Sequence, residues 1–531
     1  MSTVAPARTA SPYTGVAELI RLALRRDRVR LSVWIGLLTL MMVYAPNAVR
    51  LAYPDEPQRL ARVNLMKTPA GMIMGGPMFG INETDLGAMM ANELMLTLIV
   101  ATSILSILTV IRHTRAEEES GAAELVLSSV VGRYARTTAA LILVGAVNAV
   151  LTVTMTVAMA AAGFRVVDTF AMCVGVTAVS MVFGTVAAVT AQLWRQARTA
   201  TGAAMGALAL AALIRGIGDV IDNSGSALSW LSPIAWAQQM RAFVALRWWP
   251  LALLVAVTVG LIAVAAVLEK RRQYDDGTLP SRGDRPDAPP IRGVLGLHLT
   301  LQRGLTVGWG VGLFLGGLAF GSMTKSLIDA AETNELLARV LDAQGTDGVC
   351  TTMTQFLAAA ASAYVASAVL RVHTDEQSGT GEAVLAGAVS RWSWLLSAVA
   401  AALIGATLLM AGAGLGNGLG AGLTLGEPVT IAQLTLAGLA FVPALAVVAG
   451  VAALAVAVRR PWVVWAVVAF IVVSLYLGAL LRLPQWLLDA SPVGQTTAPT
   501  EYPVRALVVM CVVAVAFMGL AGWLYRRRDA V

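Results

Sequence analysis

The chain has 531 residues, of which 57% are hydrophobic and only 13% are charged. Soluble domains carry roughly 25% charged residues, so a mean hydropathy of +0.74 excludes an ordinary water-soluble protein. The net charge of +7 does not indicate a nucleic-acid partner, because the basic residues lie at the ends of apolar runs. We therefore expect membrane lipid to cover the excess apolar surface.

The cysteines and histidines show no metal-binding pattern. The cysteines are Cys173, Cys350 and Cys511, and the histidines are His113, His298 and His373. They form neither a Cys-x-x-Cys pair nor a spaced His/Cys cluster. We predict no metal site and no bound cofactor.

Twelve apolar stretches are long enough to cross a membrane, since a spanning helix needs about 20 residues. In chain order they cover roughly residues 31–50, 87–111, 138–162, 168–193, 199–220, 249–268, 305–325, 351–370, 393–414, 429–457, 462–481 and 505–525. They predict an all-α polytopic membrane protein. Before the first span, the basic amphipathic segment 15–29 suits an interfacial helix; a plain extension of the first span is the alternative.

The most polar stretch, residues 269–292, predicts a flexible cytoplasmic linker between two six-helix repeats, 1–268 and 293–531. With the N-terminus inside, most lysines and arginines fall in cytoplasmic segments, as the positive-inside rule requires. Both termini are therefore predicted to be cytoplasmic. Arginine greatly outnumbers lysine, which is typical of a high-GC bacterial genome, so a bacterial plasma membrane is expected.

The loops after the second and eighth spans repeat each other. Aligned with an offset of 258 (Glu118 with Glu376), residues 115–133 and 373–391 are identical at eight positions. The identical pairs are Glu118/Glu376, Ser120/Ser378, Gly121/Gly379, Glu124/Glu382, Val126/Val384, Leu127/Leu385, Val131/Val389 and Arg133/Arg391. A Ser-Pro pair also recurs, at 232–233 and 491–492. These echoes favour duplication, and repeats of six spans are parallel.

Read as a helix, Glu117, Gly121 and Glu124 share one face, and Asp375, Gly379 and Glu382 repeat it. The glycine between two carboxylates would allow close backbone approach. A surface of this kind, present twice, predicts docking of a cytoplasmic partner that is itself a two-fold pair. A solvated acidic turn is the alternative.

The pattern R-x-E-E-x-S-G-x-x-E-x-x-L-x-x-x-V-x-R of the first loop resembles ABC-2-type transporter permeases. In particular, the chain is similar over nearly its whole length to the fused, two-repeat permeases of actinobacterial exporters for polyketide antibiotics and other drugs. The resemblance implies that residues 115–133 and 373–391 are coupling helices that contact an ATPase subunit. It also implies re-entrant outer segments at 224–247 and 483–504.

That resemblance assigns ATPase coupling to specific positions. They are Glu117, Glu118, Gly121, Glu124 and Arg133 in the first loop, and Asp375, Glu376, Gly379, Glu382 and Arg391 in the second. The second loop departs from the first at His373 and Gln377, where the first has Arg115 and Glu119. This difference predicts unequal coupling surfaces.

The chain has no G-x-x-x-x-G-K-[ST] phosphate loop, so it is not predicted to hydrolyse ATP. ATP and Mg²⁺ would bind to a separate ATPase subunit, present in two copies. The glycine-rich stretch 412–422 lacks a lysine, and we interpret it as a flexible outer loop.

Charges inside spans are expensive and often functional. Glu93, with Met90, Met95 and Arg215, is predicted to line a substrate cavity; an interior ion pair, with Arg215 as the suggested partner, is the alternative. The spacing of glycines 308, 312 and 316 favours tight helix packing in the seventh span.

The sequence thus predicts the permease of an ATP-driven exporter that moves a small hydrophobic or amphiphilic compound by alternating access. A proton-coupled drug antiporter is the alternative, and it would need titratable groups near the midplane, for which only Glu93 is a candidate. No Ser/His/Asp or His-Glu-x-x-His arrangement supports a membrane enzyme.

Overall fold

The computed structural model describes residues 11–81, 85–121, 131–272, 277–278, 293–333, 345–425, 429–478, 483–499 and 501–527. These residues form helices and turns without a strand, and eleven of their helices are long and apolar enough to cross a membrane. The predicted all-α polytopic fold is confirmed. The remaining predicted span, 462–481, is represented by a shorter apolar helix, Trp462–Tyr476.

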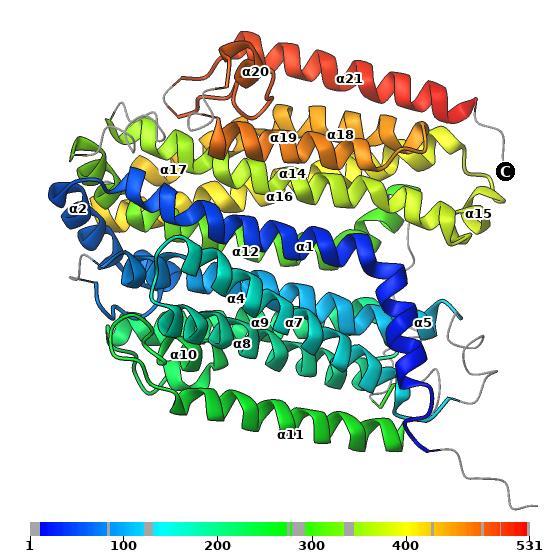
Figure 1. Ribbon diagram of the computed structural model, residues 1–531. Helices are drawn as coiled ribbons and strands as arrows, with labels where there is room; N and C mark the ends of the chain where they lie inside the picture. Colours follow the sequence, from blue (N-terminus) through cyan, green and yellow to red (C-terminus); the bar gives the residue numbers. More distant parts are fainter. Residues whose placement is uncertain are drawn as a thin grey trace, which may run out of the picture. The chain divides into compact units, whose positions relative to one another are not determined.

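The chain divides into two compact units, residues 1–286 and 287–531. The helices of unit 1 are α1 (Val16–Ala52), α2 (Glu56–Met66), α3 (Pro69–Gly75), α4 (Leu86–His113), α5 (Arg115–Glu119), α7 (Ala135–Ala161), α8 (Val166–Leu193), α9 (Ala197–Ile221), η1 (Ser229–Leu231), α10 (Pro233–Gln238) and α11 (Trp249–Arg271) (Figure 1). Helices α4 and α8 form its core, and α11 is largely exposed on its surface, as a lipid-facing helix would be.

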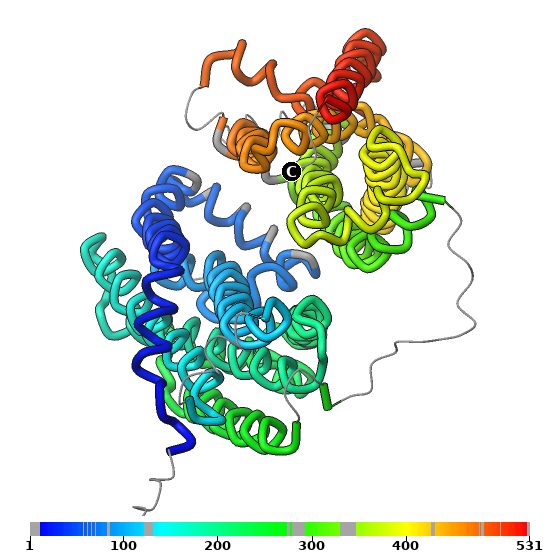
Figure 2. The backbone as a smooth tube through the Cα atoms, turned by 90° about the vertical axis from the view of Figure 1, so that its right-hand side faces the viewer, coloured from blue at the N-terminus to red at the C-terminus, as the bar shows by residue number. Residues whose placement is uncertain are grey.

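Helix α1 is continuous but not straight. Its first turns, drawn in the darkest blue, run across the ends of the neighbouring helices, while the remainder runs alongside them (Figures 1 and 2). A buried stripe of Ala23, Asp27 and Leu31 faces the unit, and Leu22 and Leu24 are exposed. This direction is compatible with the interfacial helix predicted at 15–29, and its position at a membrane surface stays a prediction.

The helices of unit 2 are α12 (Gly293–Thr333), α14 (Gly345–Gln377), α15 (Thr380–Leu385), α16 (Arg391–Leu425), α17 (Val429–Ala440), α18 (Val442–Ala457), α19 (Trp462–Leu477), α20 (Gln485–Asp489) and α21 (Val504–Arg526). The buried core of unit 2 lies mainly on α14, α16 and α18. The predicted re-entrant segments contain short helices, α10 in unit 1 and α20 in unit 2. The two Ser-Pro echoes differ, since Ser232 caps α10 while Ser491 lies in a turn after α20.

The interpretation of residues 412–422 as a flexible loop was wrong, because they form the second half of α16. Glycine lets neighbouring backbones approach closely. A Cβ atom on Gly416 would lie 2.2 Å from the carbonyl oxygen of Phe314 in α12, and one on Gly414 would lie 2.3 Å from that of Leu434 in α17. The alternating glycines therefore serve two helix contacts, one on each side of α16.

Of the three glycines predicted to pack tightly, Gly316 makes only an ordinary contact, 3.4 Å from its Cβ position to Leu357 of α14, and the prediction was wrong for Gly308 and Gly312. A Cβ atom on either would meet no described atom within 4 Å. The close contacts of α12 lie on a different face, where Cβ atoms on Gly317 and Gly321 would lie 2.2 and 2.1 Å from the carbonyl oxygens of Ala413 and Asn417. The spacing rule identified the right helix but the wrong face.

This packing predicts opposite effects for two alanine substitutions in the same helix. Gly321→Ala forces α12 from α16 and should destabilise the chain by about 1–3 kcal/mol. Gly312→Ala has room for its methyl group and gains helix propensity, so it should be neutral or stabilising. The midpoint of thermal unfolding in detergent, followed by tryptophan fluorescence, measures both. Equal midpoints for the two variants would contradict the assigned packing face.

Candidate functional site

Where both are described, the two repeated loops form the same turn. Gly121 and Gly379 both have φ of +73°, a left-handed conformation that favours glycine. In each turn the preceding serine hydroxyl donates a 3.2 Å hydrogen bond three residues back, from Ser120 to the Glu117 carbonyl and from Ser378 to the Asp375 carbonyl. The sequence repeat is therefore also a structural repeat at this point, which we call the repeated turn (residues 117–121 and 375–379).

This geometry corrects the predicted shared helix face. Helix α5 ends at Glu119, and α14 ends at Gln377, before the left-handed glycine. A Cβ atom on either glycine would meet no described atom of this chain within 4 Å, so the predicted close approach of a partner's backbone stays a prediction. The glycines are needed for the direction of the turn. Glu124 lies outside the described residues, so its predicted position beside Glu117 stays a prediction.

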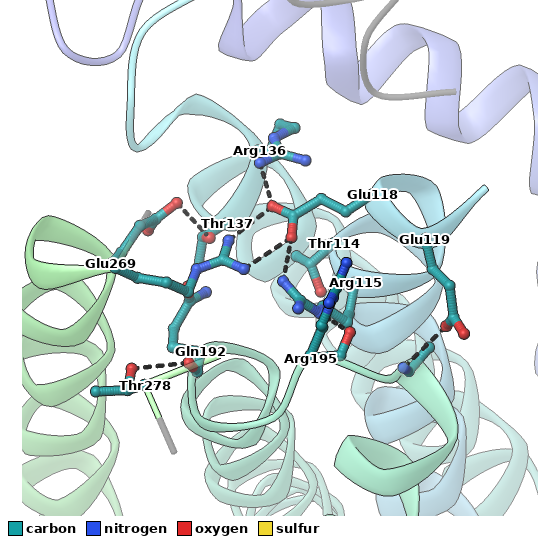
Figure 3. A network of polar contacts seen from close by, with 12 residues as sticks. Thr114, Arg115, Glu118, Glu119, Arg136, Thr137, Gln192, Arg195, Glu269 and Thr278 are labelled. Carbon is teal, nitrogen blue, oxygen red and sulfur yellow. Dashed lines mark hydrogen bonds and ion pairs between the residues drawn. The ribbon is translucent and has the colours of Figure 1, made fainter. Parts of the chain in front are cut away.

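The carboxylate of Glu118 is the centre of a buried ion-pair network (Figure 3). Arg272, just after α11, donates to both of its oxygens, at 2.7 and 2.8 Å. Arg136 of α7 and Arg115 of α5 also donate to it. Its side chain is only 2% exposed. The network joins three helices of unit 1 at one end of the bundle.

Other contacts extend this network. Arg115 also donates to the carbonyl of Arg195, between α8 and α9. Thr278, in the predicted linker, donates a 2.9 Å hydrogen bond to the carbonyl of Gln192 at the end of α8. Glu119 accepts a hydrogen bond from the first amide of α9, at Ala197. At this end of unit 1, hydrogen bonds thus connect α5 to the segment between α8 and α9, and the linker to the end of α8.

The equivalent carboxylate of unit 2 has a comparable position. Glu376 accepts a hydrogen bond from the hydroxyl of Tyr525 in α21. In both units, the repeated glutamate is therefore bonded to the end of the last long helix of its own unit. Three arginines donate to Glu118, and the Tyr525 hydroxyl donates to Glu376; the predicted inequality of the two coupling surfaces stays a prediction.

The first turns of α1 are fixed to the same end of unit 1. Glu117 pairs with Arg26 at 3.1 Å and lies 3.3 Å from His113. The buried Asp27 pairs with Arg112 at 3.0 Å and lies 2.9 Å from the other ring nitrogen of His113. The transverse part of α1 is therefore held by charged contacts against the corner between α4 and α5.

The other predicted coupling residues lie nearer the surface. Arg133 and Glu382 are exposed, and Asp375 lies 3.8 Å from Arg371. Arg391 lines a surface cleft with Trp392 and Arg526. Glu118 is the exception, since its buried carboxylate faces the arginines. We interpret it as a positioning residue that holds the repeated turn, whereas Glu119 and Glu382 are exposed.

The predicted cavity residues are only partly brought together. Glu93 forms an interior ion pair, but its partner is Arg62 of α2, at 2.5 Å, rather than the suggested Arg215. Arg215 is fully buried and instead contacts Asp219 and the carbonyls of residues 72 and 73 at the end of α3. Met90 is buried, and Met95 lines a small cavity.

That cavity lies at the opposite end of unit 1 from the repeated turn, beside α3, α4 and α10. Its walls come from Gly75, Pro77, Phe79, Ala88, Ala91, Asn92, Met95, Gln238, Arg241 and Ala242. Sequence analysis missed the polar residues Gln238 and Arg241, and also the network partners Arg272 and Tyr525. For Arg272, the sequence did contain a signal: the basic residues at the end of α11 precede the predicted linker and could have been expected to pair with the acidic repeated loop.

Comparison with known proteins identifies the family. Residues 291–526 match the family described as the C-terminal domain of the multidrug efflux system permease Rv1217c. Over 543 aligned residues the chain is 35% identical to the multidrug efflux system permease protein Rv1217c of Mycobacterium tuberculosis (strain ATCC 25618 / H37Rv), covering 98% of this chain and 96% of that protein. The chain belongs to the Rv1217c permease family.

Family membership and the eleven candidate spans make the chain a multi-pass membrane protein. The sequence-based resemblance to drug-export permeases is confirmed at the level of this family. The region that matches the C-terminal domain spans most of unit 2 and includes its repeated turn, residues 375–379. The similarity to Rv1217c therefore covers both repeated turns. The whole-chain alignment covers the turn of unit 1, and the alignment and the family model both cover the turn of unit 2.

The network predicts that the chain around Arg272 becomes accessible to protease when Glu118 loses its charge. Glu118→Gln leaves three guanidinium groups facing a neutral amide, and removing one partner of a buried ion pair is strongly destabilising. Trypsin cleavage after Arg272, whose side chain is now 7% exposed, should become at least about tenfold faster. Mass spectrometry of timed digests measures the rate. Glu119→Gln is the matched control, and equal rates in both variants would contradict the assigned role.

Proposed function

We propose that the chain is the permease of an ATP-driven efflux transporter of the ABC-2 type, with two fused six-helix repeats that export a hydrophobic or amphiphilic compound. The Rv1217c relationship supports drug efflux. The repeated turn carries the proposal of ATP coupling, because the same backbone geometry recurs 258 residues later with the same sequence pattern. Helices that only face lipid would not need such a polar turn to be repeated.

The proposed partner is a cytoplasmic ATP-binding-cassette subunit in two copies, one for each repeated turn. ATP and Mg²⁺ would bind to that subunit, since the chain has no phosphate loop. The positive-inside rule places the termini and the arginine-rich network end in the cytoplasm of a bacterial cell. The partner would then reach both turns from the same side of the membrane.

The contacts of the repeated turn suggest how force would pass into unit 1. A push on α5 acts on Glu118, which is bonded to α7 and to the residue after α11. A push on Glu117 acts on the transverse part of α1 through Arg26. Because buried charges resist separation, these helices would move with the turn. Alternating access would follow from such motion in each cycle of ATP hydrolysis.

The proposal is tested by reconstituting the chain in liposomes with and without its cognate ATPase subunit. ATP should drive ethidium accumulation only when the ATPase is present. Ethidium transport by the chain alone, driven by an imposed proton gradient, would support the antiporter alternative and contradict the proposal. The Arg62 pair of Glu93 argues against that alternative, because it engages the carboxylate that was the candidate for proton coupling.

Charge reversal on the repeated loops should uncouple the two subunits. The double variant Glu124→Lys plus Glu382→Lys should lose at least about 90% of ATP-driven transport, because like charges then face the partner, while membrane insertion stays normal. The measurements are ATP-dependent ethidium uptake and co-purification of the ATPase. Glu501→Lys reverses an exposed charge outside both loops and is the control. Normal transport by the double variant would remove the docking argument.

A further inference from the structure

A basic cleft lies on the surface of unit 2, where α16 begins and α21 ends. It has a volume of about 530 Å³, and Ser390, Arg391, Trp392 and Arg526 line it. No carboxylate is among these lining residues, and Arg526 is exposed and forms no ion pair with any described residue. The cleft is therefore positively charged and open to an anion from outside the chain.

The cleft is formed by two long helices that are in direct contact. A Cβ atom on Gly522 would clash with the indole ring of Trp392, so the glycine of α21 makes room for the first turn of α16. The hydroxyl of Ser390 accepts a 3.1 Å hydrogen bond from the amide of Ser393, which fixes that turn. Packed helix ends, rather than a loop, thus determine where the two arginines of the cleft lie.

A contrast with unit 1 explains why an arginine is available here. In unit 1 the arginine that follows the last long helix, Arg272, is bonded to Glu118 of the repeated turn. In unit 2 the hydroxyl of Tyr525 donates to the equivalent carboxylate, Glu376. The next residue, Arg526, is exposed. A neutral side chain therefore holds the turn of unit 2, and the arginine beside it faces outward.

Arg526 lies at the end of an apolar row on α21. This helix lies along the edge of unit 2 (Figures 1 and 2), and its Val508, Val512 and Val515 are more than half exposed. The chain from Val508 to Arg526 makes about five full helical turns, so both side chains lie on one face. At 1.5 Å per residue the row is about 27 Å long, which is close to the ~30 Å thickness of the hydrocarbon core.

Aromatic side chains flank the basic end of this row. Trp392 and Trp523 are both exposed, and the guanidinium carbon of Arg527 lies 3.8 Å from the ring centroid of Trp523. Tryptophan and arginine side chains are typical of the boundary between hydrocarbon and lipid headgroups. On the proposed orientation this boundary is the cytoplasmic one, where anionic lipids attract basic residues.

We infer that the cleft binds the phosphate of an anionic phospholipid, with Arg391 and Arg526 as its partners and an acyl chain along the valine row of α21. A guanidinium group suits phosphate because it can donate two parallel hydrogen bonds to the phosphate oxygens. A phospholipid fits better than a soluble phosphate because the cleft continues into a lipid-facing row. The inference goes beyond the proposed export function, since it requires neither an ATPase nor a transported compound.

Native mass spectrometry of the purified full-length chain in detergent tests the site. The chain is titrated with phosphatidylglycerol or with phosphatidylcholine of the same acyl chains. Each arginine near an anionic headgroup contributes about fivefold in affinity, so the wild-type chain should prefer phosphatidylglycerol by about 25-fold. Arg526→Gln should reduce this preference to about fivefold. The double variant Arg391→Gln plus Arg526→Gln should abolish it.

Arg505→Gln is the matched control, because it removes an exposed charge at the opposite end of the same helix and should retain the wild-type preference. Since Arg526 is exposed, its substitution should leave the fold intact.

Equal binding of the two lipids to the wild-type chain, or an unchanged preference in the double variant, would overturn the site. Displacement of phosphatidylglycerol by an equal concentration of glycerol phosphate would overturn the assignment to a lipid, because it would indicate a site for a soluble phosphate. None of these measurements involves ATP, so failure of ATP-driven transport in the reconstituted system would leave the binding result unchanged.

Discussion

One buried carboxylate, Glu118, determines how the repeated turn of unit 1 is held. Three arginines from three places in the sequence converge on it, and its side chain is 2% exposed. Buried charges are tolerated only when they are paired and hydrogen-bonded. The turn, the start of α7 and the end of α11 therefore cannot separate without exposing or stranding charge. Because of these ion pairs, a displacement of the repeated turn would also displace α7 and the end of α11.

The two units differ in which helices are joined by hydrogen bonds and which by close backbone packing. Within lipid, helix association depends on close packing and on hydrogen bonds between helices. Unit 1 joins α4 to α8 through Ser106 and Ser180, and α7 to α8 through Thr152 and Thr177, each at 2.7 Å. In unit 2, glycines bring the backbones of α12, α16 and α17 together, and hydrogen bonds join α14 to its neighbours, through Thr306 and Tyr364 at 2.9 Å and through Asn417 and Thr354 at 3.3 Å. A shared turn and a different interior are what a diverged duplication would leave.

The sequence was sufficient for features that follow from local chemistry. Lipid requires long apolar helices, so the spans were predictable, and the offset of 258 located the repeated turn before its shape was known. The sequence was not sufficient where the geometry depends on a backbone φ angle or on contacts with residues distant in the chain. Gly121 ends a helix rather than sharing its face, and Glu93 pairs with Arg62 on a different helix. Repeated glycines, interpreted as a loop, are equally compatible with a tightly packed helix.

The same limits apply to the candidate sites. Glu117 and Glu118 are adjacent and look equivalent in sequence, but the structure gives them different tasks. Glu117 contacts the transverse part of α1, and Glu118 faces the bundle interior. The cleft of Arg391 and Arg526 carried no signal in the sequence, because the two arginines are far apart in the chain and line one cleft only where α16 packs against α21. Burial and helix packing, which need three dimensions, separate these residues from their neighbours.

The central claim is that the repeated turns are the docking surface for an ATPase, and photo-crosslinking tests it most directly. Ser120 and Ser378 are exposed in the two turns, and either can be replaced by p-benzoylphenylalanine in a chain co-expressed with its cognate ATPase. The account predicts that both positions crosslink to the ATPase, whereas the same replacement at Glu501 does not. Crosslinking from neither turn, in a complex that still transports with ATP, would contradict it.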